Sequence, residues 1–295
     1  MSRPELQAPA EFYYGDTEAK KYTQNTRNQQ IQASMTYRAL ELLNLPTSSP
    51  AFLLDIGCGS GLSGEILDDE GYIWTGLDIA PSMLEVALER EVDGDLFLQD
   101  IGQGLGFRPG SFDGAISISV LQWLLTAPTS HHTSSPPFRL KKFFTSLHSA
   151  LKNPSRAVLQ FYPSDDDQIQ LVTGIARQAG FGGGVVVDYP NSNKARKVFL
   201  CLFVGGGMSG GPSSDSQQVP QGLQGDGDEL EEEGKVKFEK RRVSTRDRNA
   251  NGKRKSQKVI DRDWILKKKE LYRKRGKESV PRDSKFTGRK RKPTF

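Results

Sequence analysis

The chain has 295 residues, enough for one large domain or for one domain with appendages. Its two cysteines and three histidines give no disulfide framework and predict no metal site, and no apolar stretch is long enough to cross a membrane. Charge is segregated, because residues 235–295 hold 25 Lys and Arg against 7 Asp and Glu in a chain whose net charge is only +5. Since the start lacks a signal-peptide pattern, we expect a soluble protein of a reducing compartment.

The first fifty residues begin with a tyrosine-rich segment and continue into an amphipathic helix. Apolar residues of this helix recur at the spacing of one helix face: Ile31, Met35, Ala39, Leu42 and Leu43. Pro46 and Pro50 close the helix, because proline lacks the backbone N–H that a helix needs.

Predicted strands and helices alternate from residue 51 to residue 204. The strands are expected at residues 52–56, 73–78, 95–98, 113–119, 156–162, 185–187 and 197–204. The helices are expected at residues 61–70, 81–91, 138–151 and 165–180. Such alternation is typical of an α/β domain, so we predict that residues 1–204 form one domain around a seven-stranded, mostly parallel sheet.

Three further segments differ in composition from this domain. Residues 126–137 read as a polar, proline-rich loop. Residues 205–234 contain nine glycines and end in an acidic run, which predicts a flexible linker. Residues 235–295 form a basic region that we expect to bind nucleic acid. Within it a lone helix is expected at 262–275, so the tail is predicted to be partly helical.

The most informative motif is LLDIGCGSGLSG, followed further along the chain by WTGLDIAPSML. An apolar strand ends in Asp55, the turn after it carries Gly57, Gly59 and Gly61, and a second strand ends in Asp78. Glycines let the backbone approach a ligand closely. An acid at the end of the second strand accepts hydrogen bonds from two ribose hydroxyls. The unit therefore predicts a ligand that carries ribose.

Two classes of cofactor use this geometry. Dinucleotide enzymes place G-x-G-x-x-G directly after the strand; here Gly57 and Gly59 fit, but the last position is Leu62. Asp55 lies within the last turn of the strand, where a carboxylate would repel a pyrophosphate and suits an ammonium group. The motif therefore favours S-adenosylmethionine, which has an ammonium, a sulfonium and no phosphate.

The third and fourth strands add to this cofactor site. Asp100 follows the third strand and is placed to accept from the exocyclic amine of adenine, while Ile101 offers its backbone N–H to a ring nitrogen. In open α/β sheets the ligand lies beyond the carboxyl ends of the strands. The predicted cofactor contacts are Tyr22, Arg27, Asp55, Gly57, Cys58, Gly59, Gly61, Asp78, Ile79, Met83, Asp100, Ile101 and Ser117.

The acceptor side lacks the groups that several methylation chemistries need. It has no Asn/Asp-Pro-Pro-Tyr motif, no nearby cysteine nucleophile and no obvious Lys or His base. Stacking faces and neutral hydrogen-bonding groups remain, and we predict that they position the acceptor: Gln122, Trp123, Tyr162, Tyr189 and Asn191. This set fits an atom that already has a free lone pair, such as N7 of guanine, because alignment then supplies most of the rate.

These motifs resemble the family of 18S rRNA (guanine-N7)-methyltransferases of eukaryotic small-subunit biogenesis. The resemblance runs nearly from end to end and rests on these segments: FYYGDTEAKKYTQNTR, LLDIGCGSGLSG, GLDIAPSML, DGAISISVLQWL, SRAVLQFYP, GGGVVVDYPNSNKARKVFLCLF and TGRKRKPTF. It implies a Rossmann-like class I methyltransferase fold, S-adenosyl-L-methionine as the methyl donor and one guanosine of 18S rRNA, in the pre-40S particle, as the acceptor. It also implies a heterodimer with a small zinc-binding protein that activates several methyltransferases.

The sequence also indicates a segment to which this partner could bind. The third strand is expected at the sheet edge, and its apolar residues Leu96 and Leu98 would invite a strand from another chain. The tail has clusters of Lys and Arg that read as nuclear-import signals, so we expect the nucleolus and nucleoplasm, with the cytoplasm left open. Two alternatives stay open: an RNA-binding assembly factor whose catalysis is dispensable, and a methyltransferase acting on tRNA, protein or a small molecule.

Overall fold

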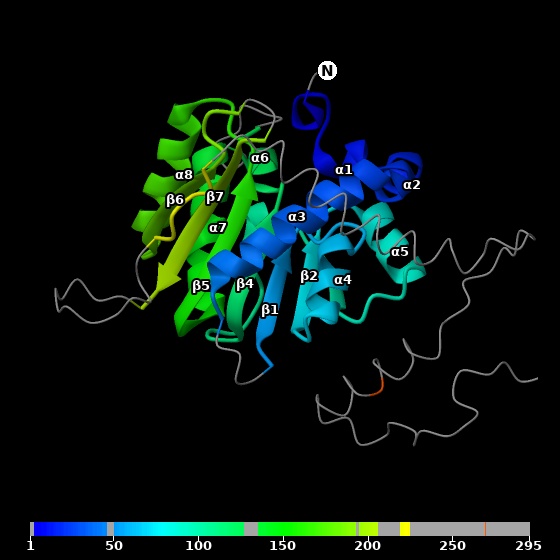
Figure 1. Ribbon diagram of the computed structural model, residues 1–295, viewed down its shortest axis with the longest axis horizontal. Coiled ribbons are helices and arrows are strands. Elements are labelled where there is room, and N and C mark those ends of the chain that lie inside the picture. Colours follow the sequence, from blue (N-terminus) through cyan, green and yellow to red (C-terminus); the bar gives the residue numbers. More distant parts are fainter. Residues whose placement is uncertain are drawn as a thin grey trace, which may run out of the picture. The chain divides into compact units, whose positions relative to one another are not determined.

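The computed structural model describes residues 3–45, 50–126, 135–192, 195–205 and 219–224, together with Lys269. The chain divides into two units, Met1–Lys235 and Val236–Phe295. All helices and strands with described bounds lie in the first unit (Figure 1). None of the described helices is long and apolar enough to span a membrane.

A seven-stranded sheet forms the centre of the first unit, in the order β3-β2-β1-β4-β5-β7-β6. Its strands are β1 (Phe52–Ile56), β2 (Ile73–Asp78), β3 (Asp95–Leu98), β4 (Phe112–Ile118), β5 (Leu151–Phe161), β6 (Gly182–Asp188) and β7 (Lys197–Val204). Neighbours from β3 to β5 are parallel, whereas β7 runs antiparallel to both β5 and β6. The predicted seven-stranded, mostly parallel sheet is therefore confirmed.

The helices are α1 (Ala10–Tyr13), α2 (Asp16–Gln24), α3 (Thr26–Leu43), α4 (Leu62–Asp69), α5 (Pro81–Glu89), α6 (Leu121–Leu124), α7 (Pro136–Ala150) and α8 (Asp166–Gln178). Of these, α3 and α4 pack on one face of the sheet, and α7 and α8 pack on the other. Side chains alternate between the faces along each strand. Leu53 of β1 joins the core under α3, and Leu54 joins the core under α7. In Figure 1, α3 crosses the near face of the sheet and α7 lies behind it.

The helix predicted from the apolar stripe in the first fifty residues is α3. Asn25 caps its first turn, because the side-chain oxygen accepts from the backbone N–H groups of Arg27 and Asn28. Asn44 ends it in the left-handed conformation, with φ at 46°. All five predicted face residues are buried or partly buried in the core beneath it. The helices α1 and α2 before it were not predicted as separate elements.

The other differences from the predicted elements are mostly at boundaries. Strand β5 begins at Leu151 rather than at residue 156, and β6 runs from Gly182 rather than from residue 185. The predicted loop at 126–137 contributes its last two residues to α7, and its residues 127–134 lie outside the described residues. The predicted helix at 262–275 and the rest of the basic tail also lie outside them, apart from Lys269.

Part of the segment predicted to be a flexible linker lies against the sheet. Of residues 205–234 the structure describes Gly205 and 219–224. The backbone N–H of Leu223 donates to Asp188 Oδ1 at 2.8 Å, and its carbonyl accepts from Tyr189 N at 2.8 Å. Arg38 of α3 donates both to Asp188, at 2.9 Å, and to the carbonyl of Gln221, at 3.1 Å. This short stretch is therefore held at the end of β6.

Candidate active site

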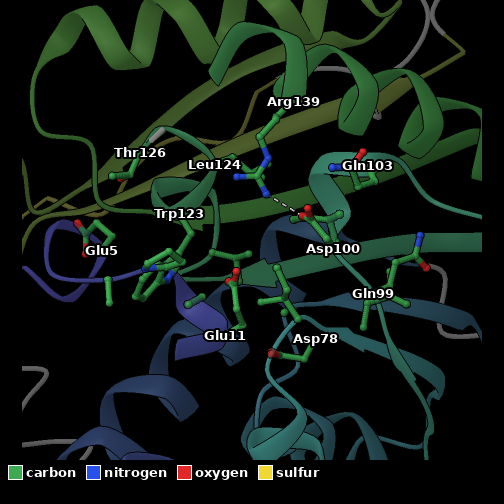
Figure 2. A pocket seen from close by; sticks show the side chains of 18 of the residues that line it. Glu5, Glu11, Asp78, Gln99, Asp100, Gln103, Trp123, Leu124, Thr126 and Arg139 are labelled. Carbon is green, nitrogen blue, oxygen red and sulfur yellow. Dashed lines mark hydrogen bonds and ion pairs between the residues drawn. The ribbon is translucent and has the colours of Figure 1, made fainter. Parts of the chain in front are cut away.

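Two cavities open at the carboxyl ends of the parallel strands. The larger has a volume of about 440 Å³ and the smaller about 70 Å³. Gly57, Val120 and Trp123 line both of them. Residues Glu5 to Glu11 of the N-terminal segment complete the wall of the larger cavity (Figure 2). The cavities thus meet where the glycine-rich turn after β1 faces the end of β4.

The glycine-rich turn approaches the cavities closely because it lacks side chains. Gly57 has φ at 73°, and a Cβ added there would collide with the side chain of Val120. The N–H groups of Gly57 and Cys58 donate to the carbonyl of Leu77, at 2.7 and 3.0 Å. The turn is therefore anchored to β2, and its exposed side forms the floor of both cavities.

Asp78 ends β2 and lines the larger cavity. Its Oδ2 accepts from Gly59 N at 2.9 Å, and its Oδ1 accepts from Ala80 N at 2.8 Å. Burial raises the pKa of this carboxyl, while these backbone hydrogen bonds act in the opposite direction. Each carboxylate oxygen keeps a further lone pair for a ligand. The group can therefore receive two hydroxyls of a ribose.

Asp55 lies in β1 with 1% of its surface exposed. Ser63 Oγ donates to its Oδ2 at 2.6 Å, and Oδ1 has no partner among the described residues. Burial raises the pKa of this carboxyl to about 7. Asp55 itself lines neither cavity, but Ser63 lines the smaller one. A buried carboxylate with an unpaired oxygen favours a cationic group in its neighbourhood.

Asp100 lies two residues beyond β3 and accepts two hydrogen bonds on Oδ1. One comes from Gly102 N at 2.9 Å and the other from Arg139 Nη2 of α7 at 2.7 Å (Figure 2). Gly102 leaves room for this pair, since a Cβ there would lie 2.7 Å from Arg139 Nη2. Both charged side chains line the larger cavity. Arg139 thus orients the carboxylate that was predicted to face adenine.

An aromatic cluster encloses the junction of the two cavities. The ring centroid of Trp123 lies 5.7 Å from that of Tyr14 and 6.0 Å from that of Tyr13. Tyr22 packs edge-on against Tyr14 at 5.6 Å. Burial raises the pKa of both the Tyr14 and the Tyr22 phenol. These hydroxyls therefore stay protonated at neutral pH, and the cluster offers ring faces rather than a base.

Most of the predicted cofactor contacts come together at these cavities. The predicted cofactor contacts that line them are Tyr22, Gly57, Cys58, Gly59, Asp78, Ile79, Met83, Asp100 and Ile101. Trp123, which was predicted to position the acceptor, lines both cavities. Gly61 begins α4 in the left-handed conformation and so shapes the turn without lining a cavity. Arg27 is exposed on α3 and is not among the residues that line the two cavities. No group of three or more described His, Cys, Asp or Glu residues could hold a metal ion.

Three predicted residues support the site rather than line it. The hydroxyl of Ser117 donates to the carbonyl of Ile56 at 2.8 Å and joins β4 to β1; Ser119, two residues later, lines the smaller cavity instead. The amide of Gln122 donates to the carbonyl of Ser119 at 2.8 Å. Tyr162 directs its hydroxyl to the sulfur of Met35, at 3.5 Å. These contacts hold the ends of β4 and β5.

The structure does not bring Tyr189 and Asn191 to the cavities. They follow β6, and β7 lies between β6 and β5 in the sheet. Neighbouring strands are about 4.8 Å apart, so the end of β6 is about 10 Å from the end of β5. Tyr189 N is bound to Leu223 O, and Asn191 is exposed. The strand order moves both residues away from the acceptor side.

Other lining residues were not found from the sequence. They include Glu5, Tyr14, Gln99 and Arg139. Tyr14 belongs to the tyrosine-rich start of the chain, which was a usable signal. Arg139 lies in the second turn of α7, with no local pattern that distinguishes it from other surface cations of that helix.

Comparison with known proteins adds independent findings. A family described as "Methyltransferase involved in Williams-Beuren syndrome" matches residues 202–293, and a general methyltransferase domain matches residues 54–159. An 18S rRNA (guanine-N(7))-methyltransferase of Arabidopsis thaliana is 52% identical over 295 residues, covering 100% of this chain and 99% of its own. The 18S rRNA (guanine(1575)-N(7))-methyltransferase of Saccharomyces cerevisiae is 52% identical, with 100% of both chains covered. That of Mus musculus is 49% identical, with 99% and 98% covered.

A solved structure shares the fold at low identity. Phosphoethanolamine N-methyltransferase 2 of Haemonchus contortus, in complex with S-adenosyl-L-methionine, is 17% identical with a TM-score of 0.50. The likeness covers 70% of this chain and 61% of that one. With the general methyltransferase domain match, it confirms the class I methyltransferase fold.

Proposed function

Because the chain belongs to the family of 18S rRNA (guanine-N7)-methyltransferases, we propose that it methylates N7 of a guanosine in 18S rRNA during small-subunit biogenesis. The cofactor is S-adenosyl-L-methionine. One structural observation carries the assignment best: Asp55, Asp78 and Asp100 lie in or just beyond three adjacent strands. A dinucleotide would meet a carboxylate where its pyrophosphate should lie.

The chain's own residues fit this cofactor. Asp78 can receive the ribose hydroxyls, Asp100 and Ile101 can receive the adenine edge, and the unpaired oxygen of Asp55 favours the ammonium end. When bound, S-adenosylmethionine supplies an electrophilic methyl group. The described lining contains no His, Lys or Cys apart from Cys58, and burial raises the pKa of that thiol. Among the described lining residues there is therefore no imidazole, amine or thiolate to serve as base or nucleophile.

An acceptor atom with a free lone pair needs neither a protein base nor a protein nucleophile. The residues act by orientation: Trp123 and the tyrosines behind it provide flat faces against which a base can stack. A guanine methylated at N7 carries a positive charge, which an aromatic face stabilises by a cation–π contact. The acceptor side thus suits N7 methylation better than a reaction that requires proton removal.

The proposed function is tested by mapping N7-methylguanosine in 18S rRNA from cells that lack the protein and from cells that regain it. Methylation should disappear and return at one guanosine. If a variant that cannot bind the donor restores small-subunit production without that methyl group, the role in assembly is separate from catalysis. If methylation is unaffected by loss of the protein, the proposed function is wrong.

We further propose that a small zinc-binding activator protein adds a strand beside β3. Among the described strands, β3 pairs only with β2. The side chains of Phe97 and Leu98 are 48% and 60% exposed, while Leu96 packs on the core beside Trp74. An apolar strand with a free edge favours strand addition. Leu98, rather than Leu96, is therefore the residue at which the interface is best broken.

Leu98→Asp should abolish co-purification with the co-expressed activator, because it places a charge in an apolar interface. The matched control is Leu171→Asp on α8, where the side chain is also exposed, at 37%. The control should co-purify normally. The partner proposal fails if the wild-type chain expressed alone is monodisperse and fully active.

We also propose that residues 235–295 supply RNA affinity and a nuclear location. Their excess of Lys and Arg neutralises phosphates and releases counterions, so affinity should fall steeply with salt. Deleting 235–295 should weaken binding to pre-rRNA, flatten its salt dependence and leave the protein in the cytoplasm. Donor affinity should not change, because every described cavity residue lies between Glu5 and Arg139. An unchanged salt slope together with nuclear accumulation of the truncated protein contradicts the proposal.

A further inference from the structure

Glu5 places a carboxylate in the wall of the larger cavity. Its side chain is only 7% exposed, and Arg3 Nη1, 3.8 Å from its Oε1, is the one cation that the described residues bring within 4 Å. Arg3 is already engaged, since its guanidinium donates to the carbonyls of Tyr162 and Pro163, at 3.1 and 3.2 Å. Within the described chain no hydrogen bond reaches Glu5. Its oxygens are not among the buried atoms without a partner, so the carboxylate opens into the cavity, where it can accept from a ligand with N–H groups.

The polar groups of S-adenosylmethionine are already assigned to other carboxylates of the site, namely Asp55, Asp78 and Asp100. Asp78 and Asp100 stand on one side of Trp123, and Glu5 stands on the other side (Figure 2). Glu5 therefore belongs to the part of the cavity that the acceptor enters. Trp123 lines this cavity as well, and its ring is the natural stacking face between the two groups of carboxylates.

The strand order gives an approximate distance between the glycine-rich turn and the segment that carries Glu5. Through Arg3, the segment that carries Glu5 is tied to Tyr162 and Pro163, just beyond the end of β5. In the sheet, β4 separates β5 from β1, which carries the glycine-rich turn. Two strand spacings amount to about 10 Å. Between the turn and Glu5 there is thus space on the scale of one planar base.

Guanine has the chemistry that this space requires. N7 lies on one edge of the base, and the donors N1–H and 2-amino lie on the opposite, Watson–Crick side. An ionised carboxylate is purely an acceptor and can take both donors at once. A base held in this way turns N7 away from Glu5, toward the glycine-rich turn. Adenine lacks the N1–H and the 2-amino group and would leave the carboxylate unpaired.

We propose that Glu5 reads the acceptor guanine by accepting hydrogen bonds from its N1–H and 2-amino groups while the base stacks on Trp123. The assignment rests on the proposed function and names the residue that selects the base. It also gives the N-terminal segment a role in recognition, because this segment supplies both Glu5 and the tyrosines packed on Trp123.

The test uses the full-length chain, with its activator where needed, and small-subunit particles from cells that lack the methyltransferase. Glu5→Gln replaces one acceptor oxygen by an N–H₂ that opposes the donors of guanine. The single-turnover methylation rate at saturating particle should fall at least tenfold. Donor affinity, particle affinity and melting temperature should stay within about twofold or 2 °C of wild type. The control, Glu18→Gln, removes an exposed carboxylate of α2 that pairs with Lys21 and should change none of these.

A second arm separates base reading from a structural role. An RNA fragment that spans the acceptor carries either guanosine or inosine, which lacks the 2-amino group. Wild type should prefer guanosine by about tenfold, the effect of one hydrogen bond to a charged group, and Glu5→Gln should reduce this preference toward one. If wild type leaves the particles unmethylated, the proposed function fails. If wild type methylates them and Glu5→Gln keeps its rate, or loses rate only in step with donor affinity and stability, the assignment of Glu5 alone is overturned.

Discussion

Replacing Gly59 with glutamate is expected to abolish methyl transfer while the protein still folds. Gly59 has φ at 53°, and a Cβ added there would lie 3.2 Å from Met83 Cε, the mobile end of a flexible side chain. The left-handed conformation costs a non-glycine residue about 1–2 kcal/mol, which a stable domain tolerates. The new carboxylate, however, would occupy the smaller cavity next to Asp78, where the donor must bind. Donor binding by calorimetry and turnover should both disappear.

The matched control is Gly110→Glu. Gly110 also has a positive φ, 67°, but a Cβ there meets nothing within 4 Å. This variant carries the same backbone strain and the same added charge away from the cavities, so it should keep wild-type donor affinity. Circular dichroism should show that both variants are folded. A folded Gly59→Glu protein with normal turnover would contradict the cofactor site placed at this turn.

Asp78→Ala should weaken binding of S-adenosylmethionine by about 30- to 150-fold, or about 2–3 kcal/mol, because two ribose hydroxyls lose their charged acceptor. Gly59 N and Ala80 N lose the same carboxylate, so the turn also becomes less ordered. Isothermal calorimetry with the methyl donor measures the change directly. NAD should bind neither the wild type nor the variant.

Asp113→Ala separates binding from stability in this experiment. Asp113 accepts from Phe52 N at 2.9 Å and pairs with Lys152 at 2.6 Å, at the opposite ends of the strands. Its removal should lower the melting temperature without changing donor affinity. Tight NAD binding by the wild type, or an Asp78→Ala protein with unchanged donor affinity, would exclude the proposed role of this carboxylate.

The residues that form the cofactor half of the site are close together in the sequence, so they could be predicted from it. Asp55, the glycines after it and Asp78 belong to one strand–turn–helix–strand unit, and local rules relate their side chains to each other. A pattern of strand, glycine-rich turn and acid therefore predicts a cavity floor without knowledge of the rest of the fold. Asp100 could be predicted for the same reason, since it lies two residues beyond the next strand of the same half-sheet.

The acceptor half depends on segments that are distant in the chain. Glu5 and Tyr14 reach the cavity from the N-terminal segment, and Arg139 reaches Asp100 from α7, 39 residues later. No periodicity or motif reports which surface side chains of a helix will face a cavity. Tyr189 was predicted to face the acceptor because it follows a strand. Its distance from the cavity, however, depends on the insertion of β7 between β5 and β6.

The amino-acid sequence by itself determined the α/β alternation, the methyl donor, the family and the basic tail, because each of these is encoded in neighbouring residues or in composition. Only the tertiary structure decided which residues face the acceptor, for it set the strand order and brought the N-terminal segment over the ends of β4 and β5. The physical reason is that Glu5, Trp123 and Arg139 are brought together by packing between elements far apart in the chain, and such packing leaves no local trace in the sequence.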